Sequence, residues 1–306
     1  MNPPRFGRAA RVLAFLLEDL KCLAQTRRRR TDRGDGAPIL MIIGLGFQLI
    51  RWPKALIDAL AAGGHRVIAF DNRDSGRSTF ATGPGPTLWQ KLKKQAPGAQ
   101  YDLSDMAGDA GGLLTHLGID RAHVVGMSMG GMIGQVIAAR YPTRVLSLTL
   151  IFSTTGSAQV GQPDLRVMLE LARKPRTEKQ AFIAQRFRVS GIIGGPGFPA
   201  DPDEARETFA LSFDRTGPEQ YKGVARQIGA ILASGDRTTE ITTPTLVIHG
   251  DRDPLVHPSG GQATAHAIPG ARHVTIAGMG HEITRSLSPT LANLILTHTA
   301  TAEPAE

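Results

Sequence analysis

The sequence predicts an α/β fold in which a mostly parallel sheet is covered by helices on both faces and carries an inserted helical cap. Continuous apolar runs of strand length alternate with segments of helical spacing over residues 37–152, which is typical of parallel strands buried on both faces. Residues 153–235 then contain helical patterns without strands, and strand character returns in residues 236–300. We therefore expect one core, made of the first and third segments, with the second inserted as the cap.

Composition and charge narrow the class of protein. The 306 residues are 41% hydrophobic and 20% charged, and no apolar run approaches the length that crosses a bilayer, so we expect a soluble globular protein. Residues 1–34 hold nine Lys and Arg against three acidic residues, so most of the net charge of +8 lies in this tail. No recognised nucleic-acid motif accompanies the tail, and we expect no nucleic-acid partner.

Cysteine usage indicates the redox compartment. Cys22 is the only cysteine, so an intramolecular disulfide or a cysteine-based metal cluster cannot form. This fits a reducing compartment, and we expect a cytoplasmic protein.

Residues 1–36 are expected to form a basic extension that is helical. Apolar side chains recur on one face of the helical pattern, at Val12, Leu13, Leu16, Leu20 and Leu23. Acidic residues interrupt this apolar segment and no small-residue cleavage site follows, so the extension is a poor secretory signal. It could make a peripheral membrane contact or be a loosely attached segment, and we favour the second.

The first part of the core leads to a turn that contains a serine. The expected strands cover residues 38–43, 65–70 and 145–152, with a short strand before residue 126. The expected helices cover residues 53–62 and 103–117, and glycines follow both of them. Residues 71–78 are expected to form a polar turn, and residues 84–98, rich in Gly and Pro, an irregular connection.

The insertion and the end of the chain follow from the same patterns. The helical patterns of the insertion cover residues 164–173, 179–189, 202–213 and 218–234. Glycine and proline are dense in residues 191–199, so this segment is either a cap loop that moves or touches a ligand, or a plain connection. Strands are expected at residues 244–250 and 273–276, a terminal helix at residues 289–297 and a frayed tail at residues 301–306.

Residues 126–130 read Gly-Met-Ser-Met-Gly and have the pattern Gly-x-Ser-x-Gly between an expected strand and an expected helix. A strand-to-helix turn this tight strains the backbone of Ser128 and leaves no room for bulk beside it. The turn exposes the hydroxyl and puts the Met129 amide at a helix N-terminus, where unpaired N–H groups favour negative charge. A five-residue pattern also occurs by chance in Gly/Ser turns, so the rest of the chain must show whether Ser128 is a nucleophile.

A serine nucleophile needs a base to take its proton and an acid to orient that base. The segment His249-Gly250-Asp251-Arg252-Asp253 places two carboxylates after a buried strand. The segment Gly278-Met279-Gly280-His281 places a histidine in a glycine-rich loop after the next strand. The chain order of serine, aspartate and histidine is the order that enzymes of the α/β-hydrolase fold use.

Over residues 37–300 the chain resembles the α/β-hydrolase superfamily, and within it the aclacinomycin methylesterase-like group. Four stretches carry this resemblance: residues 43–48 (IGLGFQ), 70–78 (FDNRDSGRS), 126–131 (GMSMGG) and 249–254 (HGDRDP). The resemblance implies that Ser128 is the nucleophile, His281 the base and Asp253 the orienting acid. It also implies that the backbone amides of Leu45 and Met129 form the oxyanion hole.

Each of these assignments has an alternative. Asp251 could be the acid, but the family pattern Gly-x-x-Asp selects Asp253, and Asp251 is expected to make a local turn. Gly46 competes with Leu45 as the second oxyanion donor. The other candidate bases lack the Gly-x-Gly-His setting: His249, His257, His266 and His273.

The family resemblance also sets expectations around the site. Residues 71–78 resemble a shared family feature that holds the loop beside the active site. Members of the family usually begin with two antiparallel strands, whereas residues 1–36 of this chain are expected to be helical.

The resulting hypothesis is a serine hydrolase that cleaves a moderately hydrophobic carboxylic ester through an acyl-enzyme, with no metal or organic cofactor. Apolar cap residues are expected to form a wall over the serine: Leu165, Met168, Leu169, Phe182, Phe187 and Phe198, of which Phe187 and Phe198 are the candidates for substrate contact. Thioester, lactone, C–C bond or amide hydrolysis and cofactor-free perhydrolysis remain alternatives, as does a ligand receptor without turnover. The sequence leaves the oligomeric state open.

Overall fold

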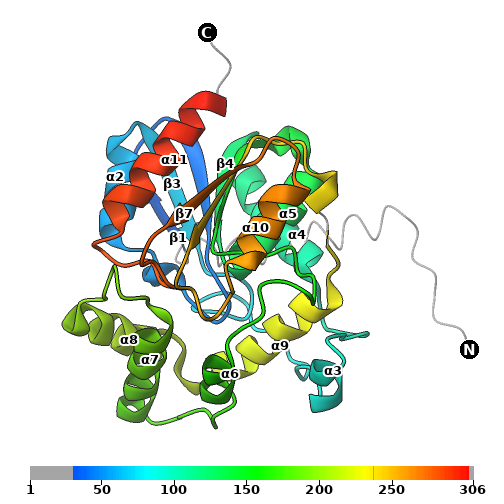
Figure 1. Ribbon diagram of the computed structural model, residues 1–306, viewed down its shortest axis with the longest axis vertical. Helices are drawn as coiled ribbons and strands as arrows, with labels where there is room; N and C mark the ends of the chain where they lie inside the picture. Colours follow the sequence, from blue (N-terminus) through cyan, green and yellow to red (C-terminus); the bar gives the residue numbers. More distant parts are fainter. Residues whose placement is uncertain (1–29, 237, 303–306) are drawn as a thin grey trace, which may run out of the picture.

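The computed structural model describes residues 30–236 and 238–302, which form a seven-stranded sheet between two layers of helices, with further helices at one end (Figure 1). The strand order is β1-β3-β2-β4-β5-β6-β7, and every neighbouring pair is parallel except β1 with β3. The strands are β1 (Arg30–Arg33), β2 (Ala37–Ile42), β3 (His65–Phe70), β4 (Ala122–Met127), β5 (Val145–Ile151), β6 (Thr245–Gly250) and β7 (Arg272–Ile276). The mostly parallel sheet that the sequence predicts is confirmed.

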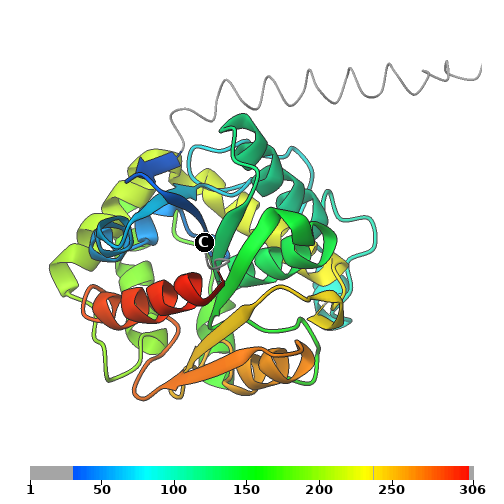
Figure 2. The same ribbon diagram turned by 90° about the horizontal axis from the view of Figure 1, so that it is seen from above.

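The central strands are buried on both faces, and their side chains alternate between two core clusters. In β2, Leu40 and Ile42 belong to one cluster, while Ile39 and Met41 belong to the other. Each such side chain stabilises the fold by about 1.5 to 3 kcal/mol when it is buried, so the alternation fixes the sheet between its helices. The first cluster is covered by α4 (Leu103–His116), α5 (Met129–Arg140) and α10 (Ser259–Ala267), and the second by α2 (Lys54–Ala62) and α11 (Ser288–Ala302) (Figure 2).

Four helices are inserted between β5 and β6, as the sequence predicts. They are α6 (Leu165–Leu171), α7 (Lys179–Ile193), α8 (Pro202–Thr216) and α9 (Gln220–Ala233). All four lie at the end of the molecule opposite the C-terminus (Figure 1). Phe182 and Phe209 are buried in a small apolar core of their own between the insertion helices.

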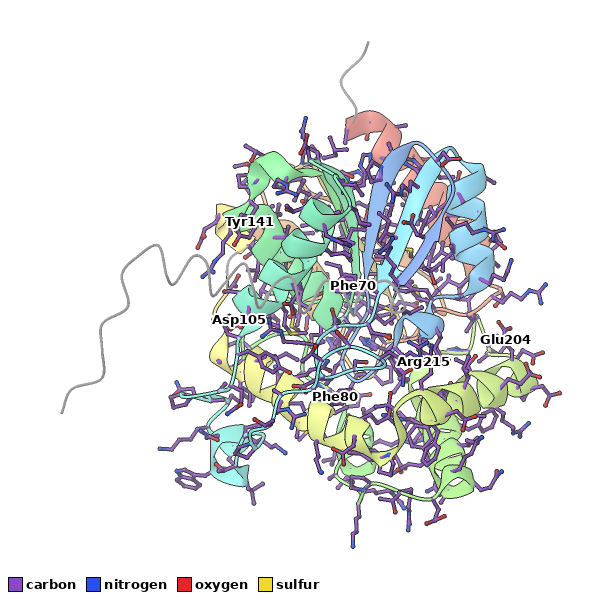
Figure 3. The ribbon with its side chains drawn as sticks, turned by 180° about the vertical axis from the view of Figure 1, so that it is seen from behind. Phe70, Phe80, Asp105, Tyr141, Glu204 and Arg215 are labelled. Carbon is purple, nitrogen blue, oxygen red and sulfur yellow. The ribbon has the colours of Figure 1, made fainter. Side chains whose placement is uncertain are left out.

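Two buried ion pairs fasten the inserted helices to the loop that follows β3. Arg215 of α8 pairs with Asp71, and Arg226 of α9 pairs with Asp74 at 2.6 Å. These four side chains are no more than 9% exposed. Arg215 lies at the junction between α8 and the core (Figure 3), so the insertion is held against the carboxyl ends of the strands.

The prediction of a helical extension is wrong for its last residues. Residues 30–33 form β1, which pairs antiparallel with β3 at the edge of the sheet. Its sequence, Arg-Thr-Asp-Arg, has no apolar alternation. The strand is held instead by backbone pairing and by the hydrogen bond from Arg66 Nη2 to Asp32 at 2.8 Å. The part of the expected helix in residues 1–29 lies outside the described residues.

The structure also contains two helices that the sequence does not predict, and two helices continue beyond their expected ends. The irregular connection contains α3 (Leu88–Leu92), which a capping box of Thr87 and Gln90 begins. Helix α7 continues to Ile193, into the segment that glycine and proline marked as a loop. Helix α10 was not predicted, because its two glycines and small residues conceal a helical pattern. Helix α11 continues to Ala302, since Thr299 is buried and bonded to His65, so residues 301 and 302 are not a frayed tail.

Short 3-10 turns complete the described structure at Leu49–Arg51, Pro142–Arg144, Gly217–Glu219 and Thr238–Glu240. Among the described helices, none is both long and apolar enough to span a bilayer.

Candidate active site

Ser128 occupies a strained turn between β4 and α5. Its φ of 54° and ψ of −122° lie outside the ordinary regions for a residue with a side chain. A Cβ atom on Gly126 would lie 2.3 Å from the Gly130 carbonyl oxygen, and one on Gly130 would lie 2.0 Å from the carbonyl oxygen of Ile42. Both glycines are therefore required by the close approach of backbone to backbone around the serine.

Three loops bring Ser128, His281 and Asp253 into one hydrogen-bonded chain. His281 Nε2 lies 3.0 Å from Ser128 Oγ, and His281 Nδ1 lies 2.7 Å from Asp253 Oδ2. The loops follow β4, β7 and β6, so the parallel sheet places all three side chains at the carboxyl ends of its strands. The aspartate and the histidine are buried, which keeps their hydrogen bond away from water.

Asp253 is held as a carboxylate by its surroundings. Its Oδ1 accepts the backbone N–H groups of Leu255 and Val256, each at 2.9 Å. Burial alone would raise the pKa of Asp253, but the electrostatic interaction with His281 and hydrogen bonds from His249 and His281 outweigh burial and lower this pKa to about 2. The carboxylate therefore accepts the Nδ1–H of His281 and leaves Nε2 free to accept a proton from the serine hydroxyl.

The loop that carries His281 is held from both sides. The Phe152 ring, fully buried, lies with its centroid 4.3 Å from that of the His281 ring. The backbone N–H of His281 donates to the Ile193 carbonyl at 2.6 Å, and the N–H of Gly197 donates to the Gly278 carbonyl at 2.9 Å. The cap segment of residues 191–199 thus packs backbone to backbone on the histidine loop.

The loop after β2 lies against the serine on its other side. A Cβ atom on Gly44 would lie 3.2 Å from Ser128 Cβ. The Gly46 amide donates to Gln227 Oε1 at 2.9 Å, so this N–H is already occupied. Within residues 30–236 and 238–302, no hydrogen bond is donated by the amides of Leu45 and Met129.

The polar turn of residues 71–78 holds this loop in place. Asn72 Nδ2 donates to the Ile43 carbonyl at 2.9 Å, and the Leu49 amide donates to Asp71 Oδ1 at 2.8 Å. Both ends of the loop beside the serine are therefore bonded to the turn.

Two residues near Asp253 make contacts that the sequence does not predict. Asp251 lies in the turn after β6, as expected, and its Oδ1 also accepts the N–H of Gly278 at 2.6 Å, which ties the acid loop to the histidine loop. His249, which lacks the Gly-x-Gly-His setting, has its Nε2 3.4 Å from Asp253 Oδ2 and 2.8 Å from the Val256 carbonyl oxygen. No spacing in the sequence indicates this contact, because His249 lies on β6 and Asp253 in the loop after it.

The structure separates the expected apolar wall into three surfaces. Phe187 packs against the small core between the insertion helices, as does the buried Phe182, while Phe198 packs against the cluster on the α2 and α11 face of the sheet. The α6 residues Leu165, Met168 and Leu169 are all more than half exposed. They do not close over Ser128, because α6 turns Val167 inward and these three side chains outward.

The sequence does not indicate a role for Gln227. It reaches the loop after β2 from a helix 181 residues further along the chain, and no pattern in the sequence links the two. In the described part of the chain, no cluster of three or more His, Cys, Asp or Glu residues is arranged to hold a metal ion.

Comparisons with known proteins agree with this architecture. The family described as alpha/beta hydrolase fold matches residues 37–191, and a family described as TAP-like protein matches residues 226–304. The chain is 30% identical to rhodomycin D methylesterase DnrP of Streptomyces peucetius and 32% identical to the corresponding DauP of Streptomyces sp. (strain C5), in each case over 87% of this chain and 92% of the relative. The crystal structure of the enol-lactonase from Burkholderia xenovorans LB400 has the same fold, with a TM-score of 0.65 and 24% identity over 89% of this chain and 95% of that chain.

The similarity to the methylesterases covers both halves of the sheet and the insertion, and it confirms the resemblance carried by the four sequence motifs. The protein belongs to the α/β-hydrolase family.

Proposed function

We propose that the protein is a serine hydrolase that cleaves carboxylic esters through an acyl-enzyme. The observation that carries this proposal is the hydrogen-bonded chain from Ser128 to His281 to Asp253, with distances of 3.0 and 2.7 Å. Ser128 Oγ attacks the ester carbonyl carbon while His281 Nε2 takes the hydroxyl proton. Asp253 fixes the imidazole tautomer and stabilises the imidazolium that forms.

The amides of Leu45 and Met129 stabilise the oxyanion of the tetrahedral intermediate. The occupied amide of Gly46 supports Leu45 over Gly46, because Gln227 already accepts the Gly46 N–H at 2.9 Å. The Met129 amide lies in the first turn of α5, where backbone N–H groups have no intrahelical acceptor. One donor of this kind is worth about 3 kcal/mol in the transition state.

The second half of the reaction follows from the same groups. When the tetrahedral intermediate collapses, the bond to the alcohol oxygen breaks and the imidazolium of His281 gives its proton to the departing alcohol. Water then attacks the acyl carbon of the ester on Ser128, with His281 taking the proton of water. The carboxylic acid leaves and the serine hydroxyl is restored.

The substrate class is an ester of a moderately hydrophobic acid with a small alcohol. The 30% and 32% identity to proteins named rhodomycin D methylesterase supports a methyl ester. Phe198 of the cap supports an apolar acyl group, because the neighbouring Gly197 donates its N–H to the Gly278 carbonyl at 2.9 Å, in the loop that carries His281.

The proposal is tested with the full chain and its Ser128→Ala variant. We expect the wild type to hydrolyse p-nitrophenyl acetate and to release methanol from aromatic methyl esters, with the variant slower by about 10³-fold or more. A fluorophosphonate probe should label one peptide, the one that contains Ser128. Unchanged turnover in the variant, or probe attached to another serine, would contradict the assignment. Faster turnover of lactones or thioesters than of methyl esters would leave Ser128 as the nucleophile but contradict the proposed substrate class.

A further inference from the structure

Large apolar side chains gather on the surface of two short helices. Nine large hydrophobic residues in the described part of the chain are exposed, and seven of them lie on α3 or α6, with exposed fractions of 52 to 74%. We call this set the α3/α6 patch; it consists of Leu88, Trp89, Leu92, Leu165, Met168, Leu169 and Leu171. Apolar groups gathered in this way on a surface mark a site of interaction.

The two helices lie at the same end of the molecule. Figure 1 shows α3 and α6 at the end opposite the C-terminus, on the cap side of the sheet. The segments beside them are joined directly, because Lys94 Nζ donates to Gln162 Oε1 at 2.7 Å. The chain before α3 packs on the cap helix α9, where a Cβ atom on Gly85 would lie 2.6 Å from the Cβ of Ala225.

Packing in the folded protein does not explain why α3 carries large apolar side chains. None of its five residues is buried, and the helix is held by its capping box instead, with Thr87 Oγ1 accepting from Gln90. A tryptophan and two leucines are therefore exposed on an element that needs none of them for packing. Trp and Leu on a surface helix are typical of segments that enter a lipid interface.

The charged residues on the segments of α3 and α6 indicate an anionic partner for the patch. Exposed cationic side chains lie on the same two segments as the apolar ones: Lys91, Lys93, Lys94, Arg166, Arg173, Lys174 and Arg176. The acidic residues of the same segments are Asp164, Glu170 and Glu178, and the buried Glu170 is paired with Arg173 at 2.8 Å. Cations near an anionic bilayer are worth about 1 kcal/mol each, and they add to the burial of apolar surface.

We propose that the α3/α6 patch binds an anionic lipid surface. The leucines, Trp89 and Met168 enter the boundary between headgroups and acyl chains, while the lysines and arginines of the same segments contact lipid phosphates. Docking in this way holds the cap end against the lipid. The backbone N–H of Asp164, beside α6, donates to the Pro254 carbonyl at 2.9 Å, one residue after Asp253, so the helix is anchored at the loop of the proposed acid.

The first test uses the full chain and vesicles made of phosphatidylglycerol with phosphatidylcholine, or of phosphatidylcholine alone. We expect sedimentation with the anionic vesicles, weaker binding as salt is added, and little binding to the neutral ones. The chain has two tryptophans, and Trp52 is only 2% exposed, so a blue shift of emission on binding reports Trp89. Trp89→Phe should remove the shift and keep the binding.

The second test removes the patch. Trp89→Ser combined with Leu169→Ser should weaken binding to anionic vesicles by about tenfold or more, because both side chains lose their burial in lipid. The matched control is Tyr141→Ser, which removes an exposed aromatic ring at the core end of the molecule, away from α3 and α6 (Figure 3), and should bind as the wild type does. All three substituted residues are on the surface, so circular dichroism should be unchanged.

Three results would overturn the proposal. Undiminished vesicle binding by the double variant would assign the contact to another part of the chain, such as residues 1–29. Equal binding to neutral and anionic vesicles would show that the lysines and arginines do not contribute to lipid binding. A dimer that the double variant dissociates, with no vesicle binding by the wild type, would make the patch an interface between two copies. The proposal does not depend on the serine chemistry, and Ser128→Ala should bind vesicles as the wild type does.

Discussion

The side chain of Gln227 accepts the backbone N–H of Gly46 at 2.9 Å and donates to the Arg73 carbonyl at 2.8 Å. Gln227 belongs to cap helix α9, and Gly46 belongs to the loop beside Ser128. The residue is fully buried, so no water competes for either bond. A cap helix thereby fixes the orientation of the loop that we propose supplies the Leu45 amide to the oxyanion.

Replacing Gln227 by leucine should lower kcat for ester hydrolysis by about tenfold with a smaller change in KM, since a loosened donor stabilises the transition state less well. The matched control is Gln220→Leu on the same helix. Gln220 is 2% exposed, and its side-chain amide has no hydrogen-bond partner in the part of the chain that the structure describes. A fall in kcat of equal size in both variants would mean that the effect is general loosening of α9.

Asp253→Asn should slow ester hydrolysis by about 10⁴-fold, because the amide favours the wrong tautomer of His281. It should also change the dependence of stability on pH. The pKa of Asp253 is lowered from 3.8 to about 2 by folding, so its ionisation stabilises the native state above pH 3.8 and this stabilisation is lost as the pH falls toward 2.

The free energy of unfolding, measured by urea denaturation, should therefore fall more steeply in the wild type than in Asp253→Asn. The difference between the two should shrink by about 1 kcal/mol from about pH 5 to about pH 3. Parallel curves over this range would show that the carboxyl group is not stabilised as a carboxylate by folding.

Gly130→Ala should destabilise the protein by about 2 kcal/mol and lower its esterase activity, because the new Cβ would lie 2.0 Å from the Ile42 carbonyl oxygen and neither backbone can move freely. Gly111→Ala on α4 is the control, since a Cβ there has no atom within 4 Å among the described residues. This control should stabilise the helix by about 0.5 to 1 kcal/mol. Urea denaturation measures both effects, and a Gly130→Ala protein as stable and active as the wild type would contradict the close approach.

Arg226→Met should destabilise the native state by about 3 kcal/mol, because it leaves the Asp74 carboxylate buried without its cation. Arg206→Met removes a cation whose ion pair with Asp203 is exposed, at 53% and 90% for the two side chains. This control substitution should destabilise the native state by less than about 1 kcal/mol. Equal effects in thermal denaturation would show that the buried pair does not fasten the cap.

Strands β2 to β7, most helices and the positions of the serine, aspartate and histidine could be predicted from the sequence because they depend on local signals. The apolar runs predict buried parallel strands, and Gly126 and Gly130 predict a turn in which backbone approaches backbone. The chain order of Ser128, Asp253 and His281 then needs only a parallel sheet to bring the three loops to one edge.

The remaining features were decided by contacts between segments far apart in the chain. Strand β1 has no apolar pattern, and it exists because β3 offers an unpaired edge. Gln227 reaches Gly46, and Asp251 reaches Gly278, through hydrogen bonds that no spacing in the sequence encodes. The sequence by itself determined which residues the core buries and in what order the site is assembled. Only the tertiary structure decided which amides remain free beside Ser128 and which leucines of α6 face outward, because hydrogen-bond partners and burial depend on what packs against each segment.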